Sequence, residues 1–291
     1  MRSLSIESPA KLNLILRVVG KRRDGYHLLY TLFHRICLRD TLRLHKRAEG
    51  IRLVCAHPKV PKSKNLIVRT FHLLKERYPF LGGVTVHLTK RIPVGGGLGG
   101  GSSDAAHFLI GMNRLYRLGL GSKDLLKLGR RLGADVAFFL SGARHAVGRG
   151  IGDKIKPVSF RRRLWFLLIP DSRGLSTRKV YQNYRRPERW ASLTKVSREV
   201  RIGSSYLERG DLERAAPFLV NDLTESAERL RPSLKKTREI LSELHLGICR
   251  MSGSGPTFFL IFKSQPRAQK ALRQLRRLGF SGGTMLCHSL L

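Results

Sequence analysis

The chain of 291 residues carries 56 Lys and Arg against 20 Asp and Glu, a formal net charge of +36, and its pI is about 11.4. Hydrophobic residues make up 42% of the chain, which is enough for a sizeable core and excludes a disordered basic tail. No apolar run approaches the roughly 20 residues of a membrane span, and Pro9 and Lys11 interrupt the stretch where a secretory signal would be apolar. The charge favours polyanionic partners: nucleic acid, acidic lipid or phosphorylated small molecules.

The four cysteines are scattered along the chain. They are Cys37, Cys55, Cys249 and Cys287, and none belongs to a Cys-x-x-Cys pair. This spacing excludes a zinc ribbon and a redox dithiol, because both need closely spaced pairs. Scattered thiols are typical of a reducing compartment, so we expect a cytoplasmic protein without a disulfide framework.

Hydrophobic periodicity predicts mixed strands and helices in both halves of the chain. The first half is predicted to contain strands within residues 1–45 around a polar turn at 21–25, a helix opening at Ser63 or Asn65, a strand over 84–88, a helix beginning near Ser102 or Ser103, a helix with Ser122 as its N-cap, and a short helix over 135–140. The second half is predicted to contain a buried strand over 164–169, mainly helices over 188–244, strands at 246–249 and 257–262, and a helix over 267–277. We therefore expect an α+β protein with a boundary near residue 155 and domains 1–155 and 156–291.

The segment RIPVGGGLGGGSSDAA, residues 91–106, is the most informative part of the sequence. Six of the seven residues from Gly95 to Gly101, here called the glycine loop, are glycine. A backbone without Cβ atoms can approach an anion closely and direct several N–H groups at it. The helix that follows adds its positive N-terminal end, so the segment is predicted to bind phosphate.

Three other interpretations of the glycine loop are weaker. Gly95 and Gly100 have the spacing of a Walker loop, but Gly101 stands where that loop needs lysine. Gly95, Gly97 and Gly100 satisfy the pattern GxGxxG, yet residues 116–120 supply no acid for a ribose, so a dinucleotide site is a minor alternative. A flexible linker is not expected, because a helix start follows immediately.

Several segments together resemble the GHMP kinase superfamily and, within it, the kinases of 4-diphosphocytidyl-2-C-methyl-D-erythritol. The glycine loop is similar to the second motif of the superfamily. The other similar segments are SPAKLNL (8–14), RDGYH (23–27), GADVAFF (133–139), GRGIG (148–152), NDL (221–223) and MSGSGPT (251–257). They stand in family order and reach from residue 8 to about residue 260, so the resemblance covers nearly the whole chain and is specific as a combination.

The resemblance implies a two-domain GHMP kinase fold, with an N-terminal domain like domain 2 of ribosomal protein S5 and a C-terminal ferredoxin-like α/β sandwich. It implies ATP-dependent phosphorylation of the 2-hydroxyl of the cytidine-diphosphate-linked methylerythritol, a step of non-mevalonate isoprenoid synthesis. ATP and Mg²⁺ are the implied cofactors, and this cytidyl compound is the implied small-molecule partner. No acidic metal ligand is evident from the sequence.

The resemblance also implies a catalytic pair. Asp135 would accept the hydroxyl proton, and Lys11 beside it would keep the carboxylate ionised and stabilise developing negative charge. The two positions are 124 residues apart, so their pairing comes from the resemblance and not from spacing. Taken from the residues alone, Asp135 could be a helix N-cap and Lys11 a solvated strand residue.

ATP phosphates are implied to lie on the glycine loop and the residues next to it. The implied contacts are Pro93, Val94, Gly95, Gly96, Gly97, Leu98, Gly99, Gly100, Gly101, Ser102 and Ser103. Ser102 or Ser103 could offer a hydroxyl to phosphate or Mg²⁺, and a role as helix N-cap is equally compatible with the sequence.

The cytidine end of the substrate is implied to meet aromatic and polar side chains. Tyr26 and His27 would contact the base, Tyr181 would stack on its other face, and Thr177 would be a polar contact. Asn13 is predicted to face the same side of its strand as the catalytic lysine and could orient the methylerythritol hydroxyls. Tyr181 lies in a helix-like stretch and could instead be a core residue.

Two other functions are compatible with the sequence. One is a nucleic-acid binding protein on the same two-layer fold, with the basic charge as its surface, since S5-like halves also occur in ribosomal proteins. The other is a related GHMP kinase that acts on a different alcohol. The combination of Lys11, Asp135 and the glycine loop favours a kinase, because an RNA-binding protein has no need of it.

Overall fold

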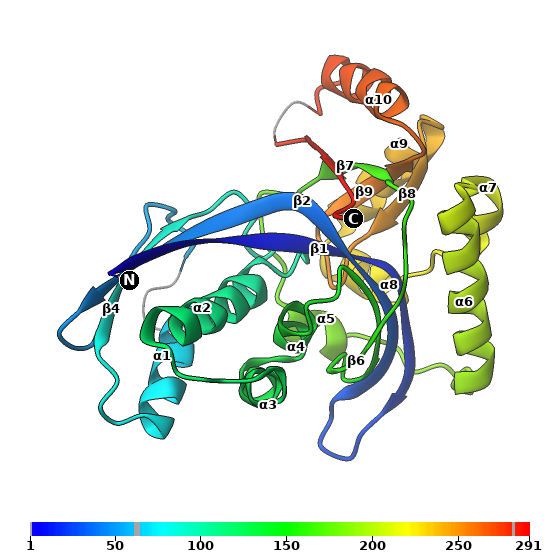
Figure 1. The fold of residues 1–291 in the computed structure, drawn as a ribbon. Coiled ribbons are helices and arrows are strands. Elements are labelled where there is room, and N and C mark those ends of the chain that lie inside the picture. Colours follow the sequence, from blue (N-terminus) through cyan, green and yellow to red (C-terminus); the bar gives the residue numbers. More distant parts are fainter. Residues whose placement is uncertain (1, 61–64, 281–282) are drawn as a thin grey trace.

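The computed structural model describes residues 2–60, 65–280 and 283–291, which form two β-sheets with surrounding helices (Figure 1). The first sheet contains β1 (Ser3–Lys21), β2 (His27–Arg47), β3 (Ile51–Val54), β4 (Gly83–Thr89), β5 (His145–Gly150) and β6 (Lys154–Pro157). Its order is β3-β4-β2-β5-β6 with β1 paired to β2, and only β3 and β4 run parallel among these described pairs. The second sheet is antiparallel in the order β10-β7-β9-β8 and contains β7 (Trp165–Ile169), β8 (Ile248–Met251), β9 (Phe258–Phe262) and β10 (Met285–His288).

The helices divide between the two halves of the chain. The first half contains α1 (Leu66–Arg77), α2 (Gly100–Tyr116), α3 (Ser122–Leu132) and α4 (Ala134–Leu140). The second half contains α5 (Thr177–Gln182), α6 (Leu193–Arg209), α7 (Leu212–Ala215), a 3-10 turn (Ala216–Phe218), α8 (Thr224–Leu230), α9 (Pro232–Glu243) and α10 (Gln265–Arg277). In the part of the chain that the structure describes, no helix combines the length and apolar character needed to cross a membrane.

The long hairpin of β1 and β2 is covered on both faces along its central part. Figure 1 shows α2 and α4 on one side of it and the second sheet on the other. On the helical side, Leu44 belongs to one core with Phe108 of α2. On the other side, Leu14 belongs to a second core with Phe166 of the second sheet. Because both faces are buried, the residues of β1 from Ser8 to Leu16 are all buried, polar ones included.

The predicted elements agree with the structure except at some ends. Asn65 caps α1, its side-chain oxygen accepting a hydrogen bond from the N–H of Ile67 at 2.8 Å, whereas Ser63 lies outside the described residues. The N-cap prediction for Ser122 was wrong, because Gly121 caps α3 and Ser122 is its first helical residue. The boundary expected near residue 155 falls within β6, which pairs with β5 in the first sheet.

The helix after the glycine loop begins earlier than predicted. α2 starts at Gly100, and its N-cap is Gly99 with a left-handed φ of 70°. Ser102 and Ser103 therefore lie inside the first turn, and their interpretation as N-caps was wrong. The physical reason is that a glycine can take the left-handed backbone conformation that ends the loop here, so the helix needs no hydroxyl to begin.

Candidate active site

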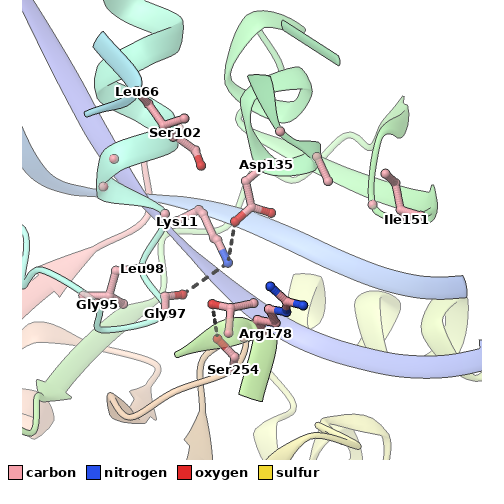
Figure 2. Close-up of a pocket in the computed structure, with 18 of the residues that line it drawn as sticks. Lys11, Leu66, Gly95, Gly97, Leu98, Ser102, Asp135, Ile151, Arg178 and Ser254 are labelled. Atoms are coloured by element: carbon pink, nitrogen blue, oxygen red, sulfur yellow. Dashed lines mark hydrogen bonds and ion pairs between the residues drawn. The ribbon is translucent and has the colours of Figure 1, made fainter. Parts of the chain in front are cut away.

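A cleft of about 1200 Å³ opens where the first sheet, the glycine loop and the second half of the chain meet (Figure 2). It is lined by the central part of β1, the start of α2, the start of α4, α5 and the turn between β8 and β9. Of the residues that the sequence singled out, those that line the cleft are Lys11, Asn13, Tyr26, His27, Pro93, Val94, Gly95, Gly96, Gly97, Leu98, Gly99, Gly100, Gly101, Ser102, Asp135, Thr177 and Tyr181. The fold thus brings nearly all of them to one place.

Lys11 and Asp135 form an ion pair inside this cleft. The Nζ of Lys11 lies 3.5 Å from Oδ2 of Asp135, and it also donates to the carbonyl of Gly97 at 3.2 Å (Figure 2). Lys11 is 3% exposed, so it is not a solvated strand residue. Gly133 is the N-cap of α4, which excludes that role for Asp135. With its side chain 35% exposed, the Asp135 carboxylate remains open to the cleft.

Asn13 is bound to the same ammonium group. Its Oδ1 accepts a hydrogen bond from Nζ of Lys11 at 2.5 Å, as expected if both side chains lie on one face of β1. The Nδ2 of Asn13 donates to Oγ1 of Thr31 at 2.8 Å, which in turn donates to the carbonyl of Ile15. This chain of bonds fixes the amide of Asn13 and therefore holds the Lys11 ammonium in place.

The glycine loop depends on backbone freedom and on close packing. Gly95, Gly97 and Gly99 all have φ near +70°. A Cβ atom at Gly97 would lie 2.2 Å from the carbonyl oxygen of Ser252, and one at Gly99 would lie 3.0 Å from the side chain of Lys11. Among the described residues no side chain caps α2, so the N–H groups of its first turn are available to a ligand. The loop can therefore bind an anion through its backbone.

The two serines after the loop have different environments. Ser102 lines the cleft, as Figure 2 shows. Ser103 is fully buried, and its hydroxyl donates to the carbonyl of Pro9 at 2.7 Å. Ser102 is thus the serine whose hydroxyl can reach a phosphate, while Ser103 ties α2 to β1.

The turn between β8 and β9 holds the glycine loop from the other half of the chain. The hydroxyl of Ser252 donates to the carbonyl of Gly97 at 3.0 Å and accepts from the backbone N–H of Asn13 at 3.3 Å. The Nδ2 of Asn221 donates to the carbonyls of Met251 and Gly253, each at 2.8 Å. The sequence motifs MSGSGPT and NDL therefore support the loop, a role that their spacing did not indicate.

Aromatic side chains from both halves of the chain gather at the far end of the cleft. The rings of His27 and Tyr181 are stacked, with centroids 5.4 Å apart, and Tyr184 packs edge-on against His27. Tyr26 is 60% exposed at the rim. Thr177 is exposed and shares a hydrogen bond of 2.9 Å with Ser254. An aromatic, partly open surface of this kind suits a planar ring.

Two ionisable groups at this end keep their neutral forms. Burial and the nearby charge of Lys21 lower the pKa of His27 below its usual range. Burial, together with the charge of Asp135, raises the pKa of Tyr181. Tyr181 both packs against a core and lines the cleft, so the two interpretations of this residue do not exclude each other.

A second cluster of buried charges lies next to the glycine loop, and two of its members, Lys90 and Asp104, also line the cleft. Lys90 forms an ion pair with Asp40 and another, at 2.9 Å, with Oδ2 of Asp104. The backbone N–H groups of Arg91 and Ile92 also donate to Asp40. This cluster, here called the Lys90 cluster (Lys90, Asp40 and Asp104), joins β2, the start of the glycine segment and α2. The sequence offered no signal for it, because Asp40 is 50 residues from Lys90 and no motif links these residues to Asp104.

Comparison with known proteins assigns the family. The models for the N-terminal and C-terminal domains of GHMP kinases match residues 65–143 and 204–280. The 4-diphosphocytidyl-2-C-methyl-D-erythritol kinase of Polynucleobacter necessarius is 38% identical over 95% of this chain and 89% of its own length. The enzyme of the same name from Chromobacterium violaceum is 40% identical over 93% and 90%. This chain belongs to the 4-diphosphocytidyl-2-C-methyl-D-erythritol kinase family of GHMP kinases.

Solved structures agree with that family. A crystal structure of 4-(cytidine 5'-diphospho)-2C-methyl-D-erythritol kinase covers 98% of both chains with a TM-score of 0.79 at 34% identity. A homoserine kinase from Cytophaga hutchinsonii, 20% identical with a TM-score of 0.73 over 100% of this chain and 95% of its own, shares the fold. The expected α+β fold with two GHMP kinase domains is therefore confirmed, and so is the class of enzyme, an ATP-dependent phosphotransferase.

Proposed function

We propose that this GHMP kinase transfers the γ-phosphoryl group of ATP to the 2-hydroxyl of 4-diphosphocytidyl-2-C-methyl-D-erythritol, in non-mevalonate isoprenoid precursor synthesis. The observation that carries the proposal is the ion pair of Lys11 and Asp135, which faces the glycine loop in a chain whose relatives bear that enzyme's name. Aromatic side chains suited to a base lie at the other end of the same cleft. The cleft thus offers a phosphate site, a base for a hydroxyl and a surface for cytosine.

In this proposal Asp135 is the general base. Its carboxylate accepts the proton of the substrate hydroxyl while the hydroxyl oxygen bonds to the γ-phosphorus and the bond to the β-phosphate oxygen breaks, releasing ADP. Lys11 donates no proton. Its buried ammonium group, held by Asn13 and the carbonyl of Gly97, pairs with Asp135 and stabilises the charge of the transferring group.

The glycine loop binds the phosphates of ATP through its backbone. Within the described residues no group of three His, Cys, Asp or Glu side chains could hold a metal ion. Mg²⁺ would be held mainly by ATP oxygens and water, and Ser102, which lines the cleft after the glycine loop, would offer it a hydroxyl. When bound, Mg²⁺ neutralises phosphate charge.

The cytidine binds at the aromatic end of the cleft. Because the rings of His27 and Tyr181 already contact each other, the base stacks on Tyr181 and Tyr26, and the neutral imidazole of His27 meets the polar edge of the base. Thr177 supplies a hydroxyl at the same end.

A substrate panel tests the proposal directly. Purified protein with ATP and Mg²⁺ is given the cytidyl methylerythritol, mevalonate, homoserine or galactose, and ADP release is measured. We expect turnover with the cytidyl compound and at least about 100-fold lower kcat/KM with the others, because they cannot occupy the aromatic end. Preferred turnover of another alcohol would overturn the proposal, and salt-sensitive RNA binding without turnover of any alcohol would favour a nucleic-acid binding protein.

A further inference from the structure

The cleft contains more cations than the catalytic pair and the Lys90 cluster require. Among the residues that the structure describes, seven basic side chains and three acidic ones line it, namely Lys11, Lys21, Arg69, Lys90, Arg130, Arg131 and Arg178 against Asp24, Asp104 and Asp135. Carboxylates in the cleft bind Lys11 and Lys90. Arg69, Arg130 and Arg131 belong to α1 and α3, in the half of the chain that carries the glycine loop. Arg178 comes from the opposite half.

Arg178 lies between the aromatic end of the cleft and the catalytic pair. It belongs to α5, directly after Thr177 and three residues before Tyr181, so its backbone is at the cytidine end. Figure 2 shows its guanidinium pointing into the cleft, toward Lys11 and Asp135. No ion pair or hydrogen bond ties this guanidinium to another side chain in the described parts of the chain.

The start of α5 is firmly placed, which gives Arg178 a defined position. The side chain of Ser176 caps the helix by accepting from the N–H of Lys179. The hydroxyls of Thr177 and Ser254 share a hydrogen bond of 2.9 Å, which joins α5 to the turn between β8 and β9. That turn in turn holds the glycine loop through Ser252. The backbone of Arg178 therefore keeps its place relative to the reacting centre.

We propose that Arg178 binds the diphosphate of the cytidyl substrate and thereby selects for it, an inference that rests on the proposed function. With cytosine on Tyr181 and the reacting hydroxyl at Asp135, the diphosphate that joins the two parts of the substrate lies between these residues. The backbone of Arg178 lies near Tyr181, and its guanidinium points toward Asp135. A guanidinium offers a planar fork of donors that matches phosphate oxygens, and Lys21 adds positive potential at the cytidine end.

The γ-phosphate of ATP offers the same phosphate oxygens as the diphosphate of the cytidyl substrate, so it is the other anion that Arg178 can bind. The two sources predict different kinetics. A contact to the diphosphate is made equally before and during phosphoryl transfer, so its loss raises KM for the cytidyl substrate. A contact to the γ-phosphate strengthens during transfer, so its loss lowers kcat or raises KM for ATP.

The first experiment measures steady-state kinetics of Arg178→Ala and Arg178→Lys. We expect Arg178→Ala to raise KM for the cytidyl substrate about tenfold, with kcat and KM for ATP within about twofold of the wild type. Arg178→Lys, which keeps the charge but loses the fork, should raise that KM about threefold. Lys179→Ala is the matched control, because Lys179 is the next exposed cation on α5 and does not line the cleft.

The second experiment measures binding of CDP and CMP by calorimetry, which does not depend on turnover. The wild type should bind CDP more tightly than CMP, and Arg178→Ala should reduce this ratio about tenfold while Lys179→Ala leaves it unchanged. An unchanged ratio in Arg178→Ala, or a loss confined to kcat and the KM for ATP, overturns the proposal. Failure of the wild type to phosphorylate the cytidyl substrate is a different result, because it removes the proposed function itself.

Discussion

Two lysine–carboxylate groups lie close to each other around the glycine loop. They differ in how many hydrogen bonds and ion pairs the oxygens of their carboxylates accept. In the Lys90 cluster both carboxylates are buried, and their oxygens accept hydrogen bonds from Lys90, from two backbone N–H groups and from the hydroxyl of Ser8. In the Lys11 pair the ammonium is equally buried, but the side chain of Asp135 is 35% exposed and faces a cleft.

This difference distinguishes an ion pair that stabilises the fold from an ion pair that the proposed function uses in catalysis. A buried carboxylate whose oxygens all accept hydrogen bonds from the fold leaves no oxygen for a substrate hydroxyl to contact. A carboxylate held by one cation, with an oxygen open to a ligand, can accept the proton of a substrate that binds beside it. Both groups contain a buried lysine and an aspartate. What distinguishes them is that Asp135 has a carboxylate oxygen open to the cleft, whereas Asp40 and Asp104 do not.

The largest expected effect is on catalysis at the open pair. Asp135→Asn removes the proposed base and should lower kcat about 10³-fold, with a midpoint of thermal unfolding close to that of the wild type. Lys11→Met should lower kcat by a similar factor. Asp124→Asn serves as the control, since Asp124 of α3 forms an exposed ion pair with Arg77 of α1. Near-normal turnover in both active-site variants would remove the distinction between the two groups.

The next effect is on stability at the Lys90 cluster. Asp40 is fully buried, so Asp40→Asn leaves the Lys90 charge with poorer compensation and should lower the free energy of unfolding by about 3 kcal/mol. Urea denaturation measures this loss, and kcat of the folded fraction should fall far less than in Asp135→Asn. Glu76→Gln, which removes an exposed pair with Arg131, should change stability little. A stable but inactive Asp40→Asn would contradict a structural role.

A smaller effect is expected in the loop between the two groups. Gly97→Ala places a methyl group at a φ of 75° and 2.2 Å from the carbonyl of Ser252, so the loop must move. We expect KM for ATP to rise about tenfold and the free energy of unfolding to fall by about 2 kcal/mol. Gly121→Ala is the control, because Gly121 has a φ of −76° and open surroundings. Equal kinetics in the two variants would show that the loop does not hold ATP.

The smallest effect concerns the pH dependence of the Lys90 cluster. Burial raises the pKa of Asp104 to about 6, with Lys90 opposing the shift and Asp40 adding to it. The folded protein therefore binds a proton at Asp104 between about pH 6 and pH 4, where an unfolded Asp remains largely ionised. Stability contributed by this group rises as the pH falls through that window.

Asp104→Asn removes this proton uptake and so isolates it. The free energy of unfolding of the wild type, minus that of Asp104→Asn, should increase by about 2 kcal/mol from pH 7 to pH 4.5. Urea denaturation of both proteins at each pH provides the measurement, and other titrating groups cancel in the difference. Parallel pH curves for the two proteins would show that Asp104 titrates in the folded state as it does in the unfolded chain.

Much of the fold could be predicted from local sequence patterns. Alternating apolar residues indicated β1, β2 and β4, and the glycine loop between a strand and a helix indicated a phosphate site. Local signals failed at two helix starts. Gly99 and Gly121 are the N-caps of α2 and α3, where the sequence predicted serines.

The net charge of +36 was a poor guide to the site. Within the described residues, seven basic side chains line the cleft, whereas the whole chain has 56. The sequence could not distinguish these seven, because clusters of Lys and Arg occur along the whole chain. Arg178 and Lys179 are adjacent exposed cations on α5, and Arg178 lines the cleft whereas Lys179 does not. That difference depends on where α5 packs, which no local pattern encodes.

By itself the sequence determined the motifs, their order and most element types, because dihedral preferences and hydrophobic periodicity act over a few residues. Tertiary structure alone decided which charged groups meet. Lys11 and Asp135 lie 3.5 Å apart because β1 is packed between two layers and α4 begins at its face, while Lys90 is enclosed by β2 and α2. Such pairs depend on the packing of segments 14 to 124 residues apart, and that packing separates a carboxylate open to the cleft from a carboxylate that holds the fold.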